Sequence, residues 1–232
     1  MIKNKLRYLV VSSIITVAFL YIFDQVMTLS YMNKIFLKMV LFTIFPMIYI
    51  IQTGDNILKS SLRNLKRDRT DNHRVNLGAV LGFIVFSIII VAYIIMNKYI
   101  DSDQLILEFQ EKYKINKGNL MSYSIYLVFV NSFLEEFFFR GFIFLNIKKL
   151  GMKKTAYVFS SILFALYHIA NFQNWFHVIM FILVLFGLFV GGCIFNYLDD
   201  KPETFLNSWF VHICADLAIV LIGFYIFGII DF

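Results

Sequence analysis

The sequence predicts an all-α membrane protein, a polytopic bundle of about seven transmembrane helices (six to eight). Of its 232 residues, 60% are hydrophobic and 28 are Phe, and the mean hydropathy is +0.75. These values lie far from those of a soluble domain. The apolar segments follow one another so closely that no room remains for a separate soluble domain, so we expect one membrane domain overall.

Three apolar segments come first in the chain, each long enough to cross a bilayer. They are expected at about residues 6–23, 35–51 and 75–96. The first follows three basic residues, but no small-x-small cleavage site comes after it, so we interpret it as a retained anchor. Lys38 lies near one end of the second segment, where its stem can extend to the membrane interface. Residues 52–74 are the most polar stretch and are expected to form a basic cytoplasmic loop.

The second part of the chain begins with a charged connection, residues 97–117, that includes the amphipathic piece LILEFQEKY. We expect this piece to lie on the membrane surface. Four more spans are expected at about residues 120–147, 155–170, 175–198 and 205–230. The chain therefore divides into residues 1–118, the N-terminal membrane helices with the basic loop, and residues 119–232, the helices that carry the candidate site.

The formal net charge of +6 is interpreted as a topology signal, because the basic residues sit in short loops between apolar segments. With the N-terminus in the cytoplasm, the inner loops hold fourteen Lys or Arg and the outer loops five. We therefore expect an integral protein of a bacterial plasma membrane, with the N-terminus cytoplasmic and the C-terminus outside. No motif points to nucleic acid. Cys193 and Cys214 lie in apolar segments without CxxC spacing, which favours buried apolar residues over a redox or metal pair.

Three ionisable residues interrupt the apolar segment NSFLEEFFFRGFIFL: Glu135, Glu136 and Arg140. A charge near the middle of a membrane costs roughly 2.5–3.5 kcal/mol on insertion scales, so such groups face a protein interior or a water-filled cavity. Glu136 and Arg140 are four residues apart with the acid first, the favourable order for an ion pair. Glu135 points about 100° away around the helix and can meet a different partner. This segment is therefore a candidate functional site, although the three residues could also form one buried structural cluster.

Two later segments also carry polar residues at helical spacing. Phe164 precedes His168 by four residues in FALYH, and His212 precedes Asp216 by four in HICAD. At about 1.5 Å of rise per residue, Glu135, His168, His212 and Asp216 lie about 11–20 Å from the cytoplasmic ends of their helices. We expect these four side chains to form one buried cluster; alternatively, each His makes an isolated hydrogen bond between helices.

These patterns, EEFFFR as EExxxR, FALYH as FxxxH and HICAD as Hxxx(N/D), resemble the CPBP intramembrane proteases, which include CAAX endopeptidases and bacterial Abi-type members. The resemblance covers about residues 122–230. It implies that Glu135 activates water together with His168, and that Glu136 and Arg140 support the site. It also implies that His212 and Asp216 polarise the scissile carbonyl and stabilise the oxyanion, with Phe164 as a supporting residue.

The function that the resemblance implies is that of an intramembrane endopeptidase, which hydrolyses a peptide bond of a membrane-associated protein or peptide. No GxSxG motif is present and both cysteines lie outside the motifs, so water is the expected nucleophile. An ionised Asp216 would repel an oxyanion, so Asp216 is either protonated, or orients His212, or helps to bind a cation.

Several alternatives stay open at this point. No cofactor is assigned, but zinc would find two imidazoles and one carboxylate in Glu135, His168 and His212. The chain could also be a non-catalytic immunity or scaffold protein of the same fold, for example in self-protection against a bacteriocin. A transporter that uses Glu135 as a proton carrier is disfavoured, because no internal repeat is evident. Prenylation of the substrate is not required by any residue.

Overall fold

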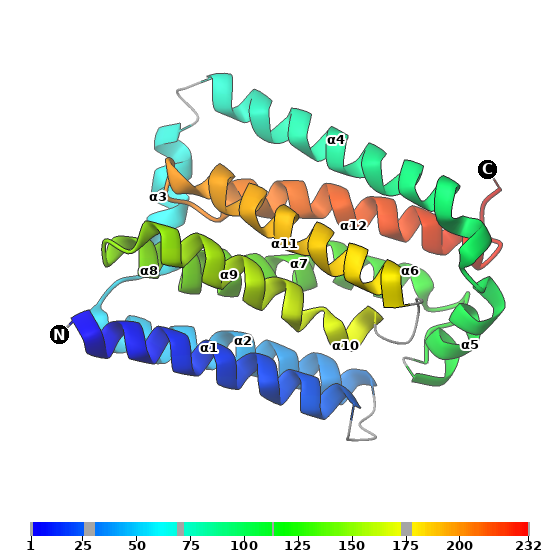
Figure 1. The fold of residues 1–232 in the computed structure, drawn as a ribbon, viewed down its shortest axis with the longest axis horizontal. Coiled ribbons are helices and arrows are strands. Elements are labelled where there is room, and N and C mark those ends of the chain that lie inside the picture. The colour runs from blue at the N-terminus through cyan, green and yellow to red at the C-terminus, as the bar shows by residue number, and fades with distance from the viewer. Residues whose placement is uncertain (1, 26–30, 69–71, 113, 173–177, 232) are drawn as a thin grey trace. The chain divides into compact units, whose positions relative to one another are not determined.

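The computed structural model describes residues 2–25, 31–68, 72–112, 114–172 and 178–231. Every regular element in these ranges is a helix, which confirms the predicted all-α class (Figure 1). Contacts divide the chain into two compact units. The first unit comprises Met1–Asp71 and Leu134–Ser208, and the second comprises Asn72–Phe133 and Trp209–Phe232.

Five helices within the described ranges are long and apolar enough to cross a membrane, as expected for an integral membrane protein. They are α1 (Ile2–Gln25), α2 (Tyr31–Thr53), α4 (Asn72–Met96), α11 (Val178–Asp200) and α12 (Leu206–Ile226). They match five of the seven predicted spans. Residues 173–177, at the predicted start of the sixth span, lie outside the described residues.

The other two predicted spans are helical but broken into shorter elements. Residues 120–149 form α6 (Leu120–Ile125), η2 (Tyr126–Asn131), α7 (Ser132–Glu136), η3 (Phe137–Phe144) and α8 (Leu145–Lys149). The elements η2 and η3 are π-helical. This conformation is rare in proteins overall, but where it occurs it is often at a functional site. The next span is α9 (Lys153–Tyr167) and α10 (Ile169–Phe172), separated at His168.

Two further α-helices are short and amphipathic. The predicted loop at residues 52–74 is wrong in part, because it contains α3 (Ile57–Asp68). The Asn56 side chain caps α3 by accepting a hydrogen bond of 2.8 Å from the Lys59 backbone N–H, and Ile57 is buried. The helix α5 (Ser102–Lys112) follows the short turn η1 (Asn97–Tyr99) and covers most of the amphipathic piece expected on the membrane surface.

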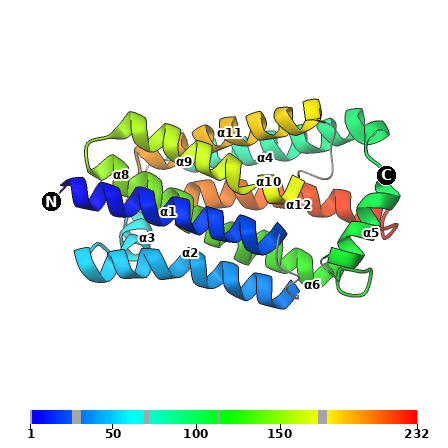
Figure 2. The same cartoon turned by 60° about the horizontal axis from the view of Figure 1, so that its bottom comes forward.

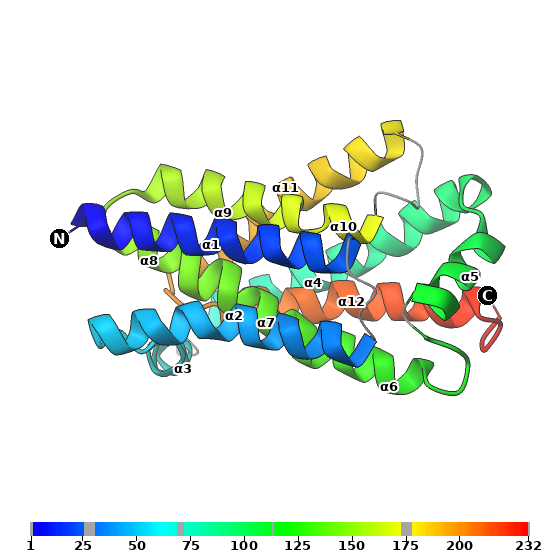
Figure 3. The ribbon, with the colours of Figure 1, turned by 90° about the horizontal axis from the view of Figure 1, so that it is seen from below.

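The core of the first unit is largely aromatic. Phe42 of α2 stacks on Phe138 of η3 with ring centroids 4.7 Å apart, and the Phe139 ring packs edge-on against Phe42. Helices α1 and α2 lie side by side (Figure 2), and α1 also runs along α9 and α10 (Figure 3). A Cβ atom on Gly141 would lie 2.9 Å from Ile57 Cγ2, so the glycine allows α3 to approach η3 closely.

A second glycine contact joins α9 to α11. A Cβ atom on Gly192 would lie 3.0 Å from the Ser161 Cα atom, so these helices pack with their backbones close together, as small residues permit in membrane bundles. This contact packs α9, which carries Phe164 and ends directly before His168, against α11.

The second unit has a small core of its own. Ile115, Leu120 and Phe227 are buried together, and Phe109 of α5 packs against them. Trp209 of α12 donates a hydrogen bond from Nε1 to Ser132 Oγ at 3.0 Å. These contacts join α5 and α6 to Phe227, directly after α12, and join α12 itself to Ser132 within this unit.

Candidate active site

Glu136 and Arg140 form the ion pair that their spacing predicted. Arg140 Nη1 lies 3.0 Å from Glu136 Oε1, and both side chains have no exposed surface. The Arg140 guanidinium also stacks over two rings, with Cζ 4.1 Å from the Phe164 centroid and 4.9 Å from the Phe195 centroid. The charge of Arg140 is therefore stabilised by the Glu136 carboxylate and by two aromatic rings. Its role as a supporting residue stays a prediction.

A further buried acidic residue near the same guanidinium was not predicted. Asp199 near the end of α11 is fully buried and lies within electrostatic range of Arg140. The Ser208 backbone N–H donates to Asp199 Oδ1 at 3.2 Å. In the sequence, Asp199 follows an apolar segment and stands beside Asp200 and Lys201, a pattern typical of a residue at the membrane interface. Its burial could therefore not be predicted from the sequence.

Glu135 occupies the centre of a separate contact network in the first unit. Its side chain is 2% exposed. Its Oε1 atom accepts hydrogen bonds from Lys38 Nζ at 2.9 Å and from the Tyr167 hydroxyl at 3.2 Å. Its Oε2 atom faces His168 Nε2 at 3.6 Å. Glu135 and Glu136 thus have different partners, as the helical spacing indicated.

The contact of Lys38 with Glu135 corrects one expectation. The side chain of Lys38 was expected to extend to the membrane interface, but its ammonium turns inward to a buried carboxylate. The favourable Coulomb energy of a charge pair in a poorly hydrated interior explains this choice. Tyr167, the residue before His168, was also missed, because a tyrosine in an apolar segment is an ordinary core residue.

His168 sits where α9 ends, with backbone φ −80° and ψ −6°. Its Nδ1 atom lies 2.7 Å from the Phe164 carbonyl oxygen. Because a carbonyl only accepts, Nδ1 is protonated and donates to this oxygen, while Nε2 faces Glu135 Oε2. Phe164 thus orients His168 through its carbonyl and stacks on Arg140 through its ring, in keeping with a supporting role.

His212 and Asp216 lie together in the second unit. Both are buried, one turn apart on α12, with His212 Nε2 3.7 Å from Asp216 Oδ1. The first unit therefore brings Glu135 and His168 together, and the second brings His212 and Asp216 together. The convergence of all four side chains stays a prediction.

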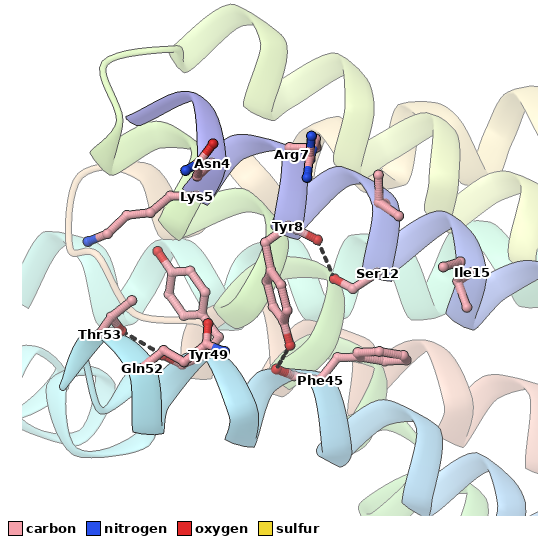
Figure 4. Close-up of a pocket in the computed structure, with 11 residues that line it drawn as sticks. Asn4, Lys5, Arg7, Tyr8, Ser12, Ile15, Phe45, Tyr49, Gln52 and Thr53 are labelled. Carbon is pink, nitrogen blue, oxygen red and sulfur yellow. Dashed lines mark hydrogen bonds between the residues drawn. The ribbon is translucent and has the colours of Figure 1, made fainter. Parts of the chain in front are cut away.

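A pocket of about 580 Å³ lies between α1 and α2, where Tyr8 donates a hydrogen bond to the Phe45 carbonyl (Figure 4). None of the predicted site residues lines it. Among the described residues, no three His, Cys, Asp or Glu side chains are grouped to hold a metal ion. The zinc alternative needs His212 beside Glu135 and His168, and it also stays a prediction.

When the chain is compared with known families, part of it matches one of them. The family model described as type II CAAX prenyl endopeptidase Rce1-like matches residues 117–218. This range contains all three motifs, from Glu135 to Asp216, and the match confirms the resemblance to the CPBP proteases. It supports a CAAX-type intramembrane protease fold and does not extend to α1 and α2. No curated protein and no solved structure matches the chain.

Proposed function

Starting from the match of residues 117–218 to the Rce1-like endopeptidases, we propose that this protein is an intramembrane endopeptidase. Its substrate is a membrane-associated protein or peptide, and water is the nucleophile. The observation that carries the proposal is the buried Glu135 carboxylate, whose Oε2 lies 3.6 Å from Nε2 of the His168 imidazole. A buried carboxylate beside an imidazole is a common arrangement for activating water by proton transfer.

The proposed reaction begins with a water molecule within hydrogen-bond reach of Glu135 Oε2 and His168 Nε2. As Glu135 accepts a proton, the water oxygen forms a bond to the scissile carbonyl carbon, and negative charge develops on the carbonyl oxygen. Collapse of this intermediate breaks the C–N bond, and the proton passes to the leaving amine. The products are a carboxylate and a free amino group.

His212 is proposed to stabilise the developing oxyanion by donating a hydrogen bond. The distance of 3.7 Å between His212 Nε2 and Asp216 Oδ1 supports the second of the three roles considered for Asp216, in which it orients His212. Asp216 then need not face the oxyanion itself, and its negative charge favours the protonated, donating form of the imidazole.

The metal-free version of this mechanism is favoured over the zinc version by the ammonium of Lys38. This group lies 2.9 Å from Glu135 Oε1 and already balances the charge of the carboxylate that zinc would use. Metal analysis of purified protein, with peptide cleavage in the presence of chelators, tests this point. Stoichiometric zinc together with chelator-sensitive cleavage would end the metal-free version.

The proposed topology places the N-terminus in the cytoplasm and the C-terminus outside, so that the substrate is presented from the cytoplasmic side. Reporter fusions at the two ends of the chain test it. Activity of a cytoplasmic reporter at the N-terminus and of an external reporter at the C-terminus is expected, and the reverse pattern would overturn the assignment.

The function itself is tested in cells by comparing membrane peptides from the native protein with those from Glu135→Gln. We expect at least one membrane peptide that changes length in Glu135→Gln and equally in His168→Ala. Glu203→Gln, which neutralises a partly exposed carboxylate on another ion pair, is the matched control and leaves the peptides unchanged. If Glu135→Gln and His168→Ala are stable and retain full biological function, the protein acts as a non-catalytic immunity or scaffold protein.

A further inference from the structure

The helices α1 and α2 lie outside the family match, yet α2 supplies the cation that contacts the candidate base. We propose that Lys38 is a positioning residue for hydrolysis, which holds the Glu135 carboxylate in its working orientation. The proposal rests on the function proposed above. It makes the N-terminal hairpin, formed by α1 and α2, a part of the active site. The sequence alone indicated only generic membrane spans there.

The first support is the geometry of the carboxylate. Lys38 Nζ and the Tyr167 hydroxyl both donate to the same atom, Glu135 Oε1, at 2.9 and 3.2 Å. Two donors that come from α2 and α9 resist rotation of the carboxylate about its last bond. Its other oxygen, Oε2, consequently stays directed at His168 Nε2. In this arrangement Oε1 is fixed by its two donors, and Oε2 is the oxygen that accepts the proton from water.

The second support is the setting of the ammonium. Lys38 Nζ lies 4.9 Å from the centroid of the Tyr167 ring and 5.5 Å from that of Phe42. Both distances are within the range of cation–π attraction. Phe42 is itself fully buried and stacked on Phe138. The aromatic rings leave the ammonium little freedom to withdraw, and the poorly hydrated surroundings strengthen its attraction for Glu135.

The same hairpin provides a matched comparison. Lys34 lies one turn before Lys38 on α2 and forms an ion pair of 2.8 Å with Asp24 of α1. The side chains of Lys34 and Lys38 are equally exposed, 15% each. Lys34→Met therefore removes an ion pair of nearly the same length from the same helix without changing a contact of Glu135.

The proposed role predicts a specific kinetic signature. Lys38 contacts the base and none of the reacting atoms, so its removal slows the proton transfer step and leaves substrate binding nearly unchanged. We expect Lys38→Met to lower kcat about tenfold to 100-fold, less than the loss of the base itself, with KM changed less than about threefold. Lys38→Arg keeps a charged donor and is expected to restore most of kcat.

The experiment uses full-length protein reconstituted in vesicles. The probe is the peptide that changes length in the Glu135→Gln cells, synthesised with a fluorophore and a quencher. Infrared difference spectra between each protein and its Glu135→Gln counterpart give a second readout that needs no substrate. The carboxylate stretch of Glu135 is expected to shift in Lys38→Met and to stay in place in Lys34→Met.

Each outcome decides between the proposals. Wild-type kcat and an unshifted carboxylate band in Lys38→Met, with Glu135→Gln inactive, would overturn the role of Lys38 and leave the proposed function standing. Equal losses in Lys38→Met, Lys38→Arg and Lys34→Met would mean that the hairpin pairs are only structural, and would also overturn it. Full activity of Glu135→Gln would overturn the proposed function and the role of Lys38 with it.

Discussion

Loss of Arg140 is the perturbation whose effect on stability can be worked out most directly from the structure. Arg140 and Glu136 are both fully buried and lie 3.0 Å apart. Arg140→Met keeps an unbranched apolar side chain but leaves the charge of Glu136 without its principal counterion. Breaking a buried pair in this way costs about 3–5 kcal/mol. Because whole domains are stable by only about 5–15 kcal/mol, the variant should unfold at a much lower temperature.

The double variant Glu136→Gln/Arg140→Met tests whether the loss of stability comes from the uncompensated charge of Glu136 or from the missing guanidinium itself. Removing both charges takes away the uncompensated carboxylate, so the double variant is expected to be more stable than Arg140→Met alone. Recovery is expected to be incomplete, because the rings of Phe164 and Phe195 lose the guanidinium that packs against them.

The assay is thermal unfolding of the detergent-solubilised full chain, followed with a thiol-reactive dye. Cys193 and Cys214 are free and partly buried, so their reaction reports the loss of structure. An Arg140→Met variant as stable as the native protein would refute the reasoning, and so would a double variant destabilised by the sum of the two single changes.

Three further predictions concern helix packing, a hydrogen bond and the metal-free mechanism. Gly192→Ala should destabilise the protein by about 1–3 kcal/mol in thermal unfolding, because its methyl group would crowd the Ser161 backbone. Gly191→Ala, with open space around it, should be neutral or stabilising in the same assay. Trp209→Phe should cost about 0.5–1.5 kcal/mol through the lost hydrogen bond to Ser132 Oγ, and Ser132→Ala should not add to that cost in the double variant. Prolonged dialysis against a chelator should leave kcat unchanged; a loss that zinc restores would contradict the metal-free mechanism.

The features that the sequence predicted well depend on local periodicity. The membrane spans follow from runs of apolar residues, and the Glu136–Arg140 ion pair follows from a four-residue spacing that the helix brings onto one face. The contact of His168 with Phe164 has the same origin, since the Phe164 carbonyl that accepts the hydrogen bond from Nδ1 lies four residues before the imidazole. Local spacing also brought His212 and Asp216 together.

The features that the sequence missed depend on contacts between distant segments. Lys34 and Lys38 are one turn apart and look alike in the sequence, but one pairs with Asp24 and the other with Glu135, 97 residues away. Asp199 and Asp200 are neighbours, yet the first is buried near Arg140 and the second pairs with Lys148 at 3.0 Å. Such choices are made by tertiary packing, which no periodicity reveals.

The helix α3 shows a different limit. Its sequence, ILKSSLRNLKRD, is so basic that its polarity dominated the interpretation as a loop. The cap from Asn56 and the burial of Ile57 against Gly141 supply the local and tertiary stabilisation that make it a helix.

The central claim, that Glu135 and His168 activate water, is tested most directly by single-turnover cleavage of a membrane peptide by purified, reconstituted protein. We expect cleavage by the native protein, a rate about 10²- to 10⁴-fold lower for Glu135→Gln and for His168→Ala, and no further loss when the two changes are combined. Cleavage by Glu135→Gln at the native rate would contradict it.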